Sequence, residues 1–167
     1  MALPKIEVPT YELTLPSRDE KVAFRPFTVK EEKIMMIASE SEDEKEILNA
    51  VSRIIETCTF DKLNVKKLPI FDIEYIFLQI RAKSVGEVAK FKVLCPDDHK
   101  TYVDVDLDIT QVDVHVDDEH NNKIIFDKDR NLGVVLGYPT LDMTKVGDSL
   151  QNMKTEDLFD IIISCVD

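Results

Sequence analysis

Near the N-terminus, hydrophobic and polar positions alternate along two short segments. These are YELTL (11–15) and KVAFRPF (21–27), and the polar run PSRDE lies between them. Apolar residues at every second position are typical of a strand that buries one face. Proline, serine and aspartate favour turns, so the intervening run closes the pair. We therefore expect a β-hairpin over residues 11–27.

The helical period governs the next two segments, which span residues 28–39 and 44–58. Thr28 stands three residues before Glu31, which predicts a capping box, in which the two residues satisfy each other's free backbone N–H groups. Ser41 and Glu44 repeat this spacing ahead of the second helix. The apolar positions of the second helix recur along one stripe. They are Ile47, Leu48, Val51, Ile54, Ile55 and Cys58.

A third helix is predicted over residues 70–83. Pro69 precedes it, where the first helical turn tolerates proline. Apolar residues cover most sides of this helix, which is typical of a helix at the centre of a fold. Gly86 marks its end or the turn just beyond. One apolar face is formed by Ile70, Ile73, Phe77 and Ile80, and Phe71, Ile76 and Leu78 widen it.

From residue 87 onward the pattern changes to a period of two. Segments 87–95 and 101–109 predict a second hairpin around the turn PDDHK, with its apolar face directed inward. Asp104, Asp106 and Asp108 lie on the outer face of its second strand. The apolar face comprises Ala89, Phe91, Val93, Cys95, Val103, Val105, Leu107 and Ile109. Further strands are predicted at VDVHV (112–116), KIIFD (123–127) and LGVVLGYP (132–139).

A last helix is predicted over residues 156–167, capped by Thr155. Its apolar stripe runs to the final residue, which favours a natural product that continues further. The order of elements indicates an α+β fold: an N-terminal β-hairpin, a helical segment, an antiparallel β-meander and a C-terminal helix. We expect the hairpin and helices of 1–86 to pack with the meander of 87–139 as one domain. A truncated C-terminal helical segment, 140–167, follows.

Composition is that of an ordinary soluble protein. With 167 residues, 44% of them hydrophobic and 32% charged, the chain can bury a core without disulfides or metal. No apolar run approaches the roughly 20 residues of a membrane span, and the N-terminus lacks the pattern of an export signal. The three cysteines have no paired spacing, which favours reduced thiols in the cytosol.

Charge is unevenly distributed along the chain. The formal net charge is −12, and residues 97–167 carry 17 of the 33 acidic side chains but only 6 of the 21 basic ones. An acidic half repels phosphates, so we do not expect direct binding to DNA or RNA. It fits a solvated surface, or one that steers a basic partner.

The residues most suited to binding a metal ion lie around the second predicted turn. Cys95 and His99 could supply two zinc ligands, and His115 or His120 could add more. A structural zinc site takes four nitrogen or sulfur ligands, usually from two close pairs, and the second pair is missing here. A calcium loop over the alternating aspartates would need glycine and glutamate where Ile109 and His115 stand. The sequence therefore favours a hairpin without metal.

Patterns for catalysis or cofactor binding are not found. There is no G-x-S-x-G segment, and the four glycines form no phosphate-binding loop. Cys58 lies on an apolar helical stripe, where a packed thiol is favoured over a reactive one. We therefore expect neither enzymatic activity nor a cofactor.

Protein–protein binding is better supported. The third and last helices carry more apolar residues than a fold of this size needs to cover, so each stripe is either core or a partner surface. The partner-binding candidates are Ile73, Ile76, Phe77 and Ile80 on the third helix and Leu158, Phe159 and Ile162 on the last.

Three segments carry a family resemblance: FRPFTVKEEKIMMIASESEDEKEILNAVSRIIETCTFD, LPIFDIEYIFLQIRAKSVGE and GVVLGYPTLD. Together they resemble the baseplate hub assembly proteins of contractile-tailed T-even (T-four-type) bacteriophages, over about residues 9–141. In such relatives the loop matching CPDDHK often holds paired cysteines. Only Cys95 stands there in this chain, as in a zinc-ribbon-like hairpin without its metal.

The resemblance implies a role in building the tail, in the host cytoplasm during assembly and in the virion baseplate if the protein is retained. It implies baseplate hub subunits and the tape measure protein as partners, with homo-oligomers as a further case, and no nucleic acid or membrane. The first hypothesis is a non-enzymatic assembly factor, such as a chaperone for the tape measure protein. The alternatives are a permanent structural hub subunit and a metal-dependent enzyme using Cys95, His99 and nearby carboxylates.

Overall fold

The structure is a computed structural model, and it describes residues 8–41, 43–117, 119–143 and 155–166. The α+β class predicted from the periodicity is confirmed, and the order of the elements roughly matches the prediction. The strands are β1 (Tyr11–Thr14), β2 (Lys21–Phe24), β3 (Val88–Leu94), β4 (Tyr102–Asp108), β5 (Lys123–Asp127) and β6 (Leu132–Val135). The helices are α1 (Val29–Glu40), α2 (Glu44–Cys58), α3 (Ile70–Ser84) and α4 (Thr155–Ser164), with short 3-10 turns η1 (Val65–Lys67) and η2 (Ile109–Gln111).

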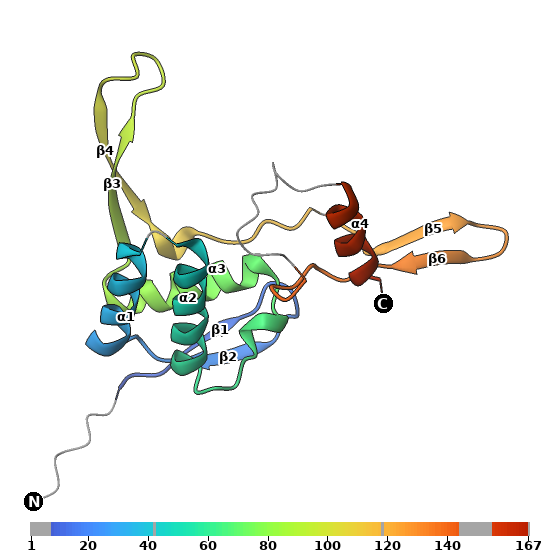
Figure 1. Cartoon of the computed structure of the whole chain (residues 1–167), viewed down its shortest axis with the longest axis horizontal. Coiled ribbons are helices and arrows are strands. Elements are labelled where there is room, and N and C mark those ends of the chain that lie inside the picture. Colours follow the sequence, from blue (N-terminus) through green and yellow to red (C-terminus); the bar gives the residue numbers. More distant parts are fainter. Residues whose placement is uncertain (1–7, 42, 118, 144–154, 167) are drawn as a thin grey trace, which may run out of the picture.

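The strands pair into separate antiparallel hairpins. Within the described residues these are β1–β2, β3–β4 and β5–β6, and no two of them share a sheet. The strands predicted as one continuous meander over 87–139 are therefore two hairpins that point in different directions. Figure 1 shows β3–β4 projecting from the body that α1, α2, α3 and the β1–β2 hairpin form (the helical body). It shows β5–β6 projecting beside α4 at the other side of the molecule.

The strand predicted at 112–116 is not formed. This segment is an extended connection between η2 and β5, although its apolar and polar residues alternate. One cause is local: the side chain of Asp113 accepts a hydrogen bond from the Val114 backbone N–H at 2.8 Å. A side chain that captures a backbone donor in this way competes with the ladder of a sheet.

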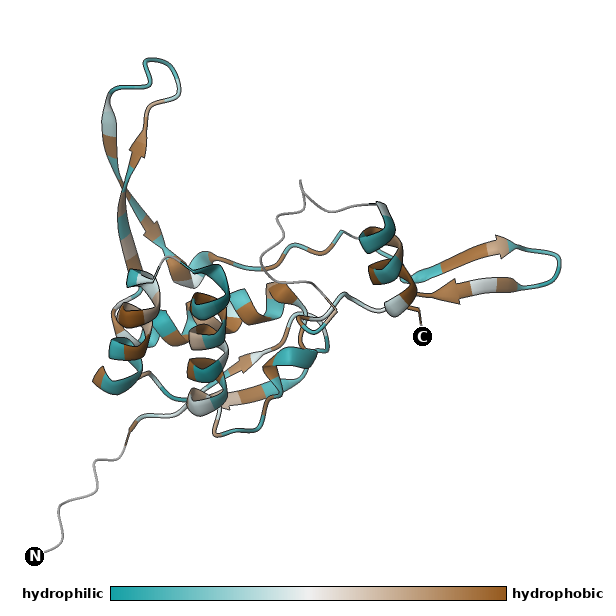
Figure 2. Cartoon of the chain, in the orientation of Figure 1, coloured by the Kyte–Doolittle hydropathy of each residue, from teal (hydrophilic) through white to brown (hydrophobic). Residues whose placement is uncertain are grey.

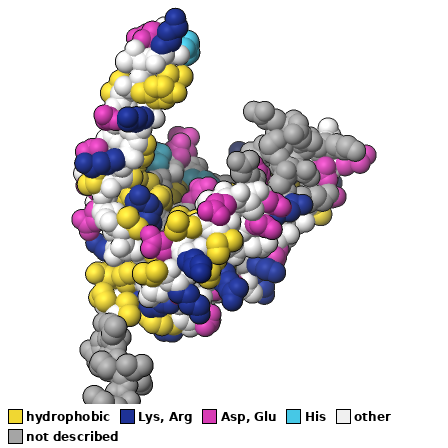
Figure 3. All heavy atoms as spheres, turned by 60° about the vertical axis from the view of Figure 1, so that its left-hand side comes forward, with side chains coloured by type: hydrophobic (Ala, Val, Ile, Leu, Met, Phe, Trp, Pro, Cys, Tyr) yellow, Lys and Arg dark blue, Asp and Glu magenta, His cyan; other side chains and the backbone are white. Residues whose placement is uncertain are grey.

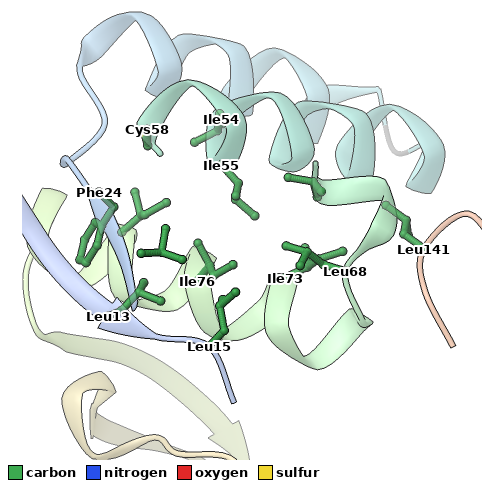
Figure 4. Close-up of a cluster of buried hydrophobic side chains, with 13 residues drawn as sticks. Leu13, Leu15, Phe24, Ile54, Ile55, Cys58, Leu68, Ile73, Ile76 and Leu141 are labelled. Atoms are coloured by element: carbon green, nitrogen blue, oxygen red, sulfur yellow. The ribbon is translucent and has the colours of Figure 1, made fainter. Parts of the chain in front are cut away.

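The main core lies where the β1–β2 hairpin packs against α2 and α3 (Figure 4). Because the hairpin and α2 both cover α3, Ile76 and Ile80 are 0% exposed. The buried members of this core are Leu13, Leu15, Val22, Phe24, Ile54, Ile55, Cys58, Val65, Leu68, Ile73, Ile76, Ile80 and Leu141. A smaller cluster of Ala82, Ala89 and Ile109 joins the end of α3 to the base of β3–β4.

A buried carboxyl group ties the first hairpin to α3. Asp72, in the first turn of α3, is 0% exposed. It accepts a hydrogen bond from the Ser17 backbone N–H at 3.1 Å and another from the Ser17 hydroxyl. Buried polar groups need such partners, so this contact sets the position of the β1–β2 turn over α3.

One of the two predicted capping boxes is confirmed. At the start of α1, Thr28 and Glu31 satisfy each other as expected. The box predicted between Ser41 and Glu44 is wrong, because Asp43 caps α2 by accepting from the Lys45 backbone N–H at 2.8 Å. The Ser41 hydroxyl instead donates to the Ala38 carbonyl and so closes the end of α1.

The last part of the chain returns to the body before it forms α4. The Leu141 backbone N–H donates to the Leu68 carbonyl at 3.1 Å, and the Leu141 side chain enters the main core. Helix α4 ends at Ser164 rather than running to residue 167. Beyond it, Val166 forms an isolated antiparallel bridge with Leu136, which holds α4 against the segment after β6.

Candidate protein-interaction surfaces

Most of the predicted partner surface on α3 is core. Ile73, Ile76 and Ile80 lie in the main core, with exposed fractions of 3% or less. They cannot contact a partner in this fold, because the β1–β2 hairpin and α2 occupy that side of the helix. Phe77 differs from them: it is partly buried against the core and also lines an open groove.

This α1–α3 groove has a volume of about 480 Å³, within the roughly 300–1,000 Å³ range of binding pockets. It lies between α1 and α3, with Ile54 of α2 in its wall. Its apolar lining residues are Phe27, Met35, Met36, Ile54, Phe77 and Val85, and its polar ones are Glu31, Glu32, Ser39, Glu40 and Arg81. Methionine side chains adapt to the shape of an apolar ligand, so the groove suits an apolar protein segment.

An ion pair and hydrogen bonds of Glu31 hold the α1 wall of the groove. Glu31 is 5% exposed and accepts from Arg25 Nη2 at 2.9 Å and from the Thr28 backbone N–H at 2.7 Å. Burial alone would raise the pKa of Glu31, but hydrogen bonds from Thr28 and Arg25 and the charge of Arg25 outweigh it and lower that pKa to about 2. The carboxylate therefore fixes the first turn of α1 against the end of β2.

A second tie fixes the α3 wall. The Phe27 backbone N–H donates to the Ser84 hydroxyl oxygen at 2.9 Å, and that hydroxyl donates to the Ile80 carbonyl at 2.6 Å. The segment that enters α1 is thus bound to the last turn of α3. Since both walls are held by hydrogen bonds, the groove is formed before any ligand arrives, which reduces the entropy cost of binding.

Uncovered apolar and charged groups surround the groove. Met36 and Val85 in its lining are exposed, and so are Glu32 and Glu40 at the rim. The Arg81 Nη1 atom is buried and has no hydrogen-bond partner among the residues that the structure describes. Figure 3 shows hydrophobic side chains at the surface of the helical body and along the projecting hairpin.

The sequence prediction missed this groove. Its signal was the run Ile34–Ala38, five consecutive apolar residues in one helix. Five neighbours on a helix point in different directions, so they cannot all face one core. In the structure Ala38 is buried, whereas Met36 and Ile37 are 61% and 59% exposed.

The β3–β4 hairpin, residues 88–108, forms an arm whose apolar face was predicted to point inward. That prediction is wrong beyond the base of the arm, because only Ala89 and Ile109, at that base, are buried among the residues of the predicted apolar face. Phe91 and Val93 on β3 are 43% and 47% exposed, and Val103 and Leu107 on β4 are 52% and 44% exposed. Figure 2 shows hydrophobic stretches alternating with hydrophilic ones along the arm.

Hydrogen bonds among its own residues close the tip of the arm. Asp98 accepts from the backbone N–H groups of Lys100 and Thr101, both at 3.0 Å. Together with the Thr101 hydroxyl, these bonds lower the pKa of Asp98 to about 2. The His99 backbone N–H donates to the Cys95 carbonyl at 3.0 Å, so these two residues close the turn through their backbones.

The other candidate ligands lie elsewhere. The His120 ring stacks on Tyr138, with Nε2 and the tyrosine hydroxyl 2.9 Å apart, and His115 is exposed on the connection to β5. In the described ranges no three His, Cys, Asp or Glu side chains are grouped as a metal would require. Cys58 is buried, and burial raises the pKa of its thiol to about 11.

Helix α4 keeps its candidates at the surface. Leu158, Phe159 and Ile162 are all exposed, and none of the residues within the bounds of α4 is buried. These three side chains therefore remain available to a partner. In the described parts of the chain, no helix has the length and apolarity to cross a membrane.

Comparison with known proteins adds one finding to this geometry. A family model described as T4 bacteriophage base plate protein matches residues 8–167, almost the whole chain. No curated protein matches the chain, and no solved structure matches it.

Proposed function

The chain belongs to the T4 bacteriophage base plate protein family, and we propose that it is a hub assembly factor that binds other tail proteins and catalyses no reaction. The observation that carries this proposal is the α1–α3 groove. It is mainly apolar, its walls are held by hydrogen bonds, and its lining includes the exposed side chains of Met36 and Val85. Apolar surface of this kind favours burial by a partner, at about 25 cal/mol per Å² covered.

The residues that line the groove indicate which kind of protein segment would bind there. Its walls suit a helix that presents apolar side chains at positions i, i+3 or i+4, and i+7. Glu32 and Glu40 at the rim favour lysine or arginine beside those apolar positions. Arg81 in the wall favours a carboxylate or carbonyl oxygen at one end of the segment. We infer that the occupant is an amphipathic, basic-flanked helix of another tail protein, and the resemblance to hub assembly proteins makes the tape measure protein the first candidate.

The test compares two neighbouring residues of α1. Met36 lines the groove, whereas Ile37 is equally exposed but lies outside it. We expect Met36→Asp to weaken binding of the partner at least about tenfold, because a charge would be desolvated in the complex. Ile37→Asp should bind as the unmodified protein does.

The measurement has two steps. The partner is captured from infected cells, identified by mass spectrometry, and its binding segment is then titrated against each purified variant, with circular dichroism to confirm that both variants fold. Equal affinity for both variants, or an identified partner segment with an acidic, non-helical sequence, would contradict the groove proposal.

A permanent structural subunit is the alternative role for the same binding surface, and the projecting hairpins and α4 favour it. They leave apolar surface outside the groove uncovered, as a subunit buried in a larger particle would. Quantitative mass spectrometry of purified mature tails beside infected-cell lysate separates the two. A fixed copy number in the tails supports the structural subunit, whereas abundance in the lysate and absence from tails supports the assembly factor.

A further inference from the structure

The two edges of the β3–β4 arm are both free. The arm is a two-stranded sheet, and in the described part of the chain neither β3 nor β4 pairs with another strand on its outer side. An isolated two-stranded hairpin is marginally stable in water, and free edges are templates for further pairing. The arm therefore has both the hydrogen-bonding groups and the uncovered apolar face of an incomplete sheet.

The register separates the two faces of the arm completely in its middle. Phe91 pairs with Val105 and Val93 with Val103 on one face. The opposite face carries the charged pairs, in which Lys90 lies across from Asp106 and Lys92 across from Asp104. Lys90 Nζ and Asp106 Oδ2 are 3.9 Å apart.

Each strand carries charge of a single sign on the charged face. On β3 the charges are Lys90 and Lys92, and on β4 they are Asp104, Asp106 and Asp108. If two copies paired β3 with β3, lysines would lie beside lysines, and pairing β4 with β4 would place aspartates beside aspartates. Like charges directly opposite destabilise a strand pair. Only β3 of one copy beside β4 of another brings opposite charges together.

We propose that the arm is a self-association element, in which β3 of one copy pairs antiparallel with β4 of a second copy. The register of the arm, continued across the junction, places Lys90 beside Asp106 and Lys92 beside Asp104 of the neighbouring copy. It also extends the apolar face of Phe91 into that of the next arm. Alternate residues of an antiparallel strand direct their N–H and C=O groups to opposite sides, so this register also satisfies the free edges.

Such a junction is heterologous, because β3 and β4 are different surfaces. Heterologous contacts repeat until they close into a ring or extend as a filament. A ring of arms would leave no free edge, and curvature toward the apolar face would enclose Phe91, Val93, Val103 and Leu107. This inference goes beyond the proposed function and does not use the α1–α3 groove, so either can fail without the other.

A charge exchange tests the pairing. Lys90→Asp with Lys92→Asp alone would also place like charges within the arm and could unfold it. The quadruple variant K90D/K92D/D104K/D106K restores opposite charges both within the arm and between identical copies. We expect it to self-associate like the unmodified chain, but β3 of one protein should not pair with β4 of the other, because every mixed β3–β4 junction pairs like charges.

The readout is native mass spectrometry at low salt, with one of the two proteins uniformly labelled with nitrogen-15, and sedimentation velocity over the full soluble concentration range. We expect mixed β3–β4 junctions to be at least about tenfold weaker than matched ones. Circular dichroism of the quadruple variant confirms its fold. A chain that stays monomeric at its highest soluble concentration would overturn the proposal. So would a folded quadruple variant that stays monomeric while the unmodified chain self-associates, because both proteins keep opposite charges across the proposed β3–β4 junction.

Discussion

Replacing Glu31 by glutamine should remove a large, pH-dependent part of the stability of this protein. The carboxylate accepts from Arg25 and Thr28, and its side chain is only 7% exposed, so water screens these interactions little. A carboxyl group whose pKa falls from 4.5 to about 2 on folding contributes about 3 kcal/mol when it is ionised in both states. Glutamine keeps the shape of the side chain but lacks the charge.

The sign of the pH dependence follows from the lowered pKa. Above about pH 4.5 the group is ionised in the folded and unfolded chains, and the full contribution is present. As the pH falls from about 4.5 toward about 2, the unfolded chain takes up the proton first and the contribution is lost. We therefore expect Glu31→Gln to cost about 3 kcal/mol at pH 7, and less than about 1 kcal/mol near pH 2.

Urea denaturation at a series of pH values measures this difference directly. Glu32→Gln is the matched control, because Glu32 is the exposed neighbour in the same helical turn, and it should change stability by less than about 0.5 kcal/mol. A cost for Glu31→Gln that stays constant from pH 7 to pH 2 would refute the electrostatic account and assign the effect to packing. The same variant should loosen the α1 wall of the groove and weaken partner binding at neutral pH.

Two further outcomes follow from burial. Ile76→Ala should lower the free energy of unfolding, measured by urea denaturation, by about 2–5 kcal/mol, because Ile76 is 0% exposed in the main core. The control Ile163→Ala, at an exposed site on α4, should change it by no more than about 0.5 kcal/mol. Equal costs would contradict the assignment of the α3 stripe to the core. Cys58 should react with a thiol reagent only after unfolding, since burial raises the pKa of its thiol to about 11. Cys95, at the arm tip, should react in the folded protein. Rapid labelling of Cys58 at pH 8 would refute its burial.

The two proposed binding surfaces, the groove and the arm, lie on different parts of the chain. The groove lies on the helical body, and its walls are fixed by Glu31 and Ser84. The arm projects from that body on a narrow base, where Ala82, Ala89 and Ile109 pack together. The two proposals are therefore compatible: one copy could hold a partner helix on its body while its arm joins a neighbouring copy.

Local elements could be predicted from the sequence, because their signals act over a few residues. The alternation in 11–15 and 21–27 predicted the first hairpin, and Thr28 with Glu31 predicted the start of α1, since each depends on groups two to four positions apart. The local signal failed at the start of α2, where Asp43 and not Ser41 caps the helix, because only the folded backbone decides which side chain reaches a free N–H group.

Which apolar faces are covered depends on tertiary packing, which the sequence pattern does not report. The stripe of Ile73, Ile76 and Ile80 and the face of Phe91 and Val93 are both apolar in sequence, yet the first is core and the second is exposed. The difference arises because β1–β2 and α2, distant in sequence, pack on α3, whereas no described element packs on the outer part of the arm. Burial depends on such long-range packing, and periodicity reports only that a face is apolar.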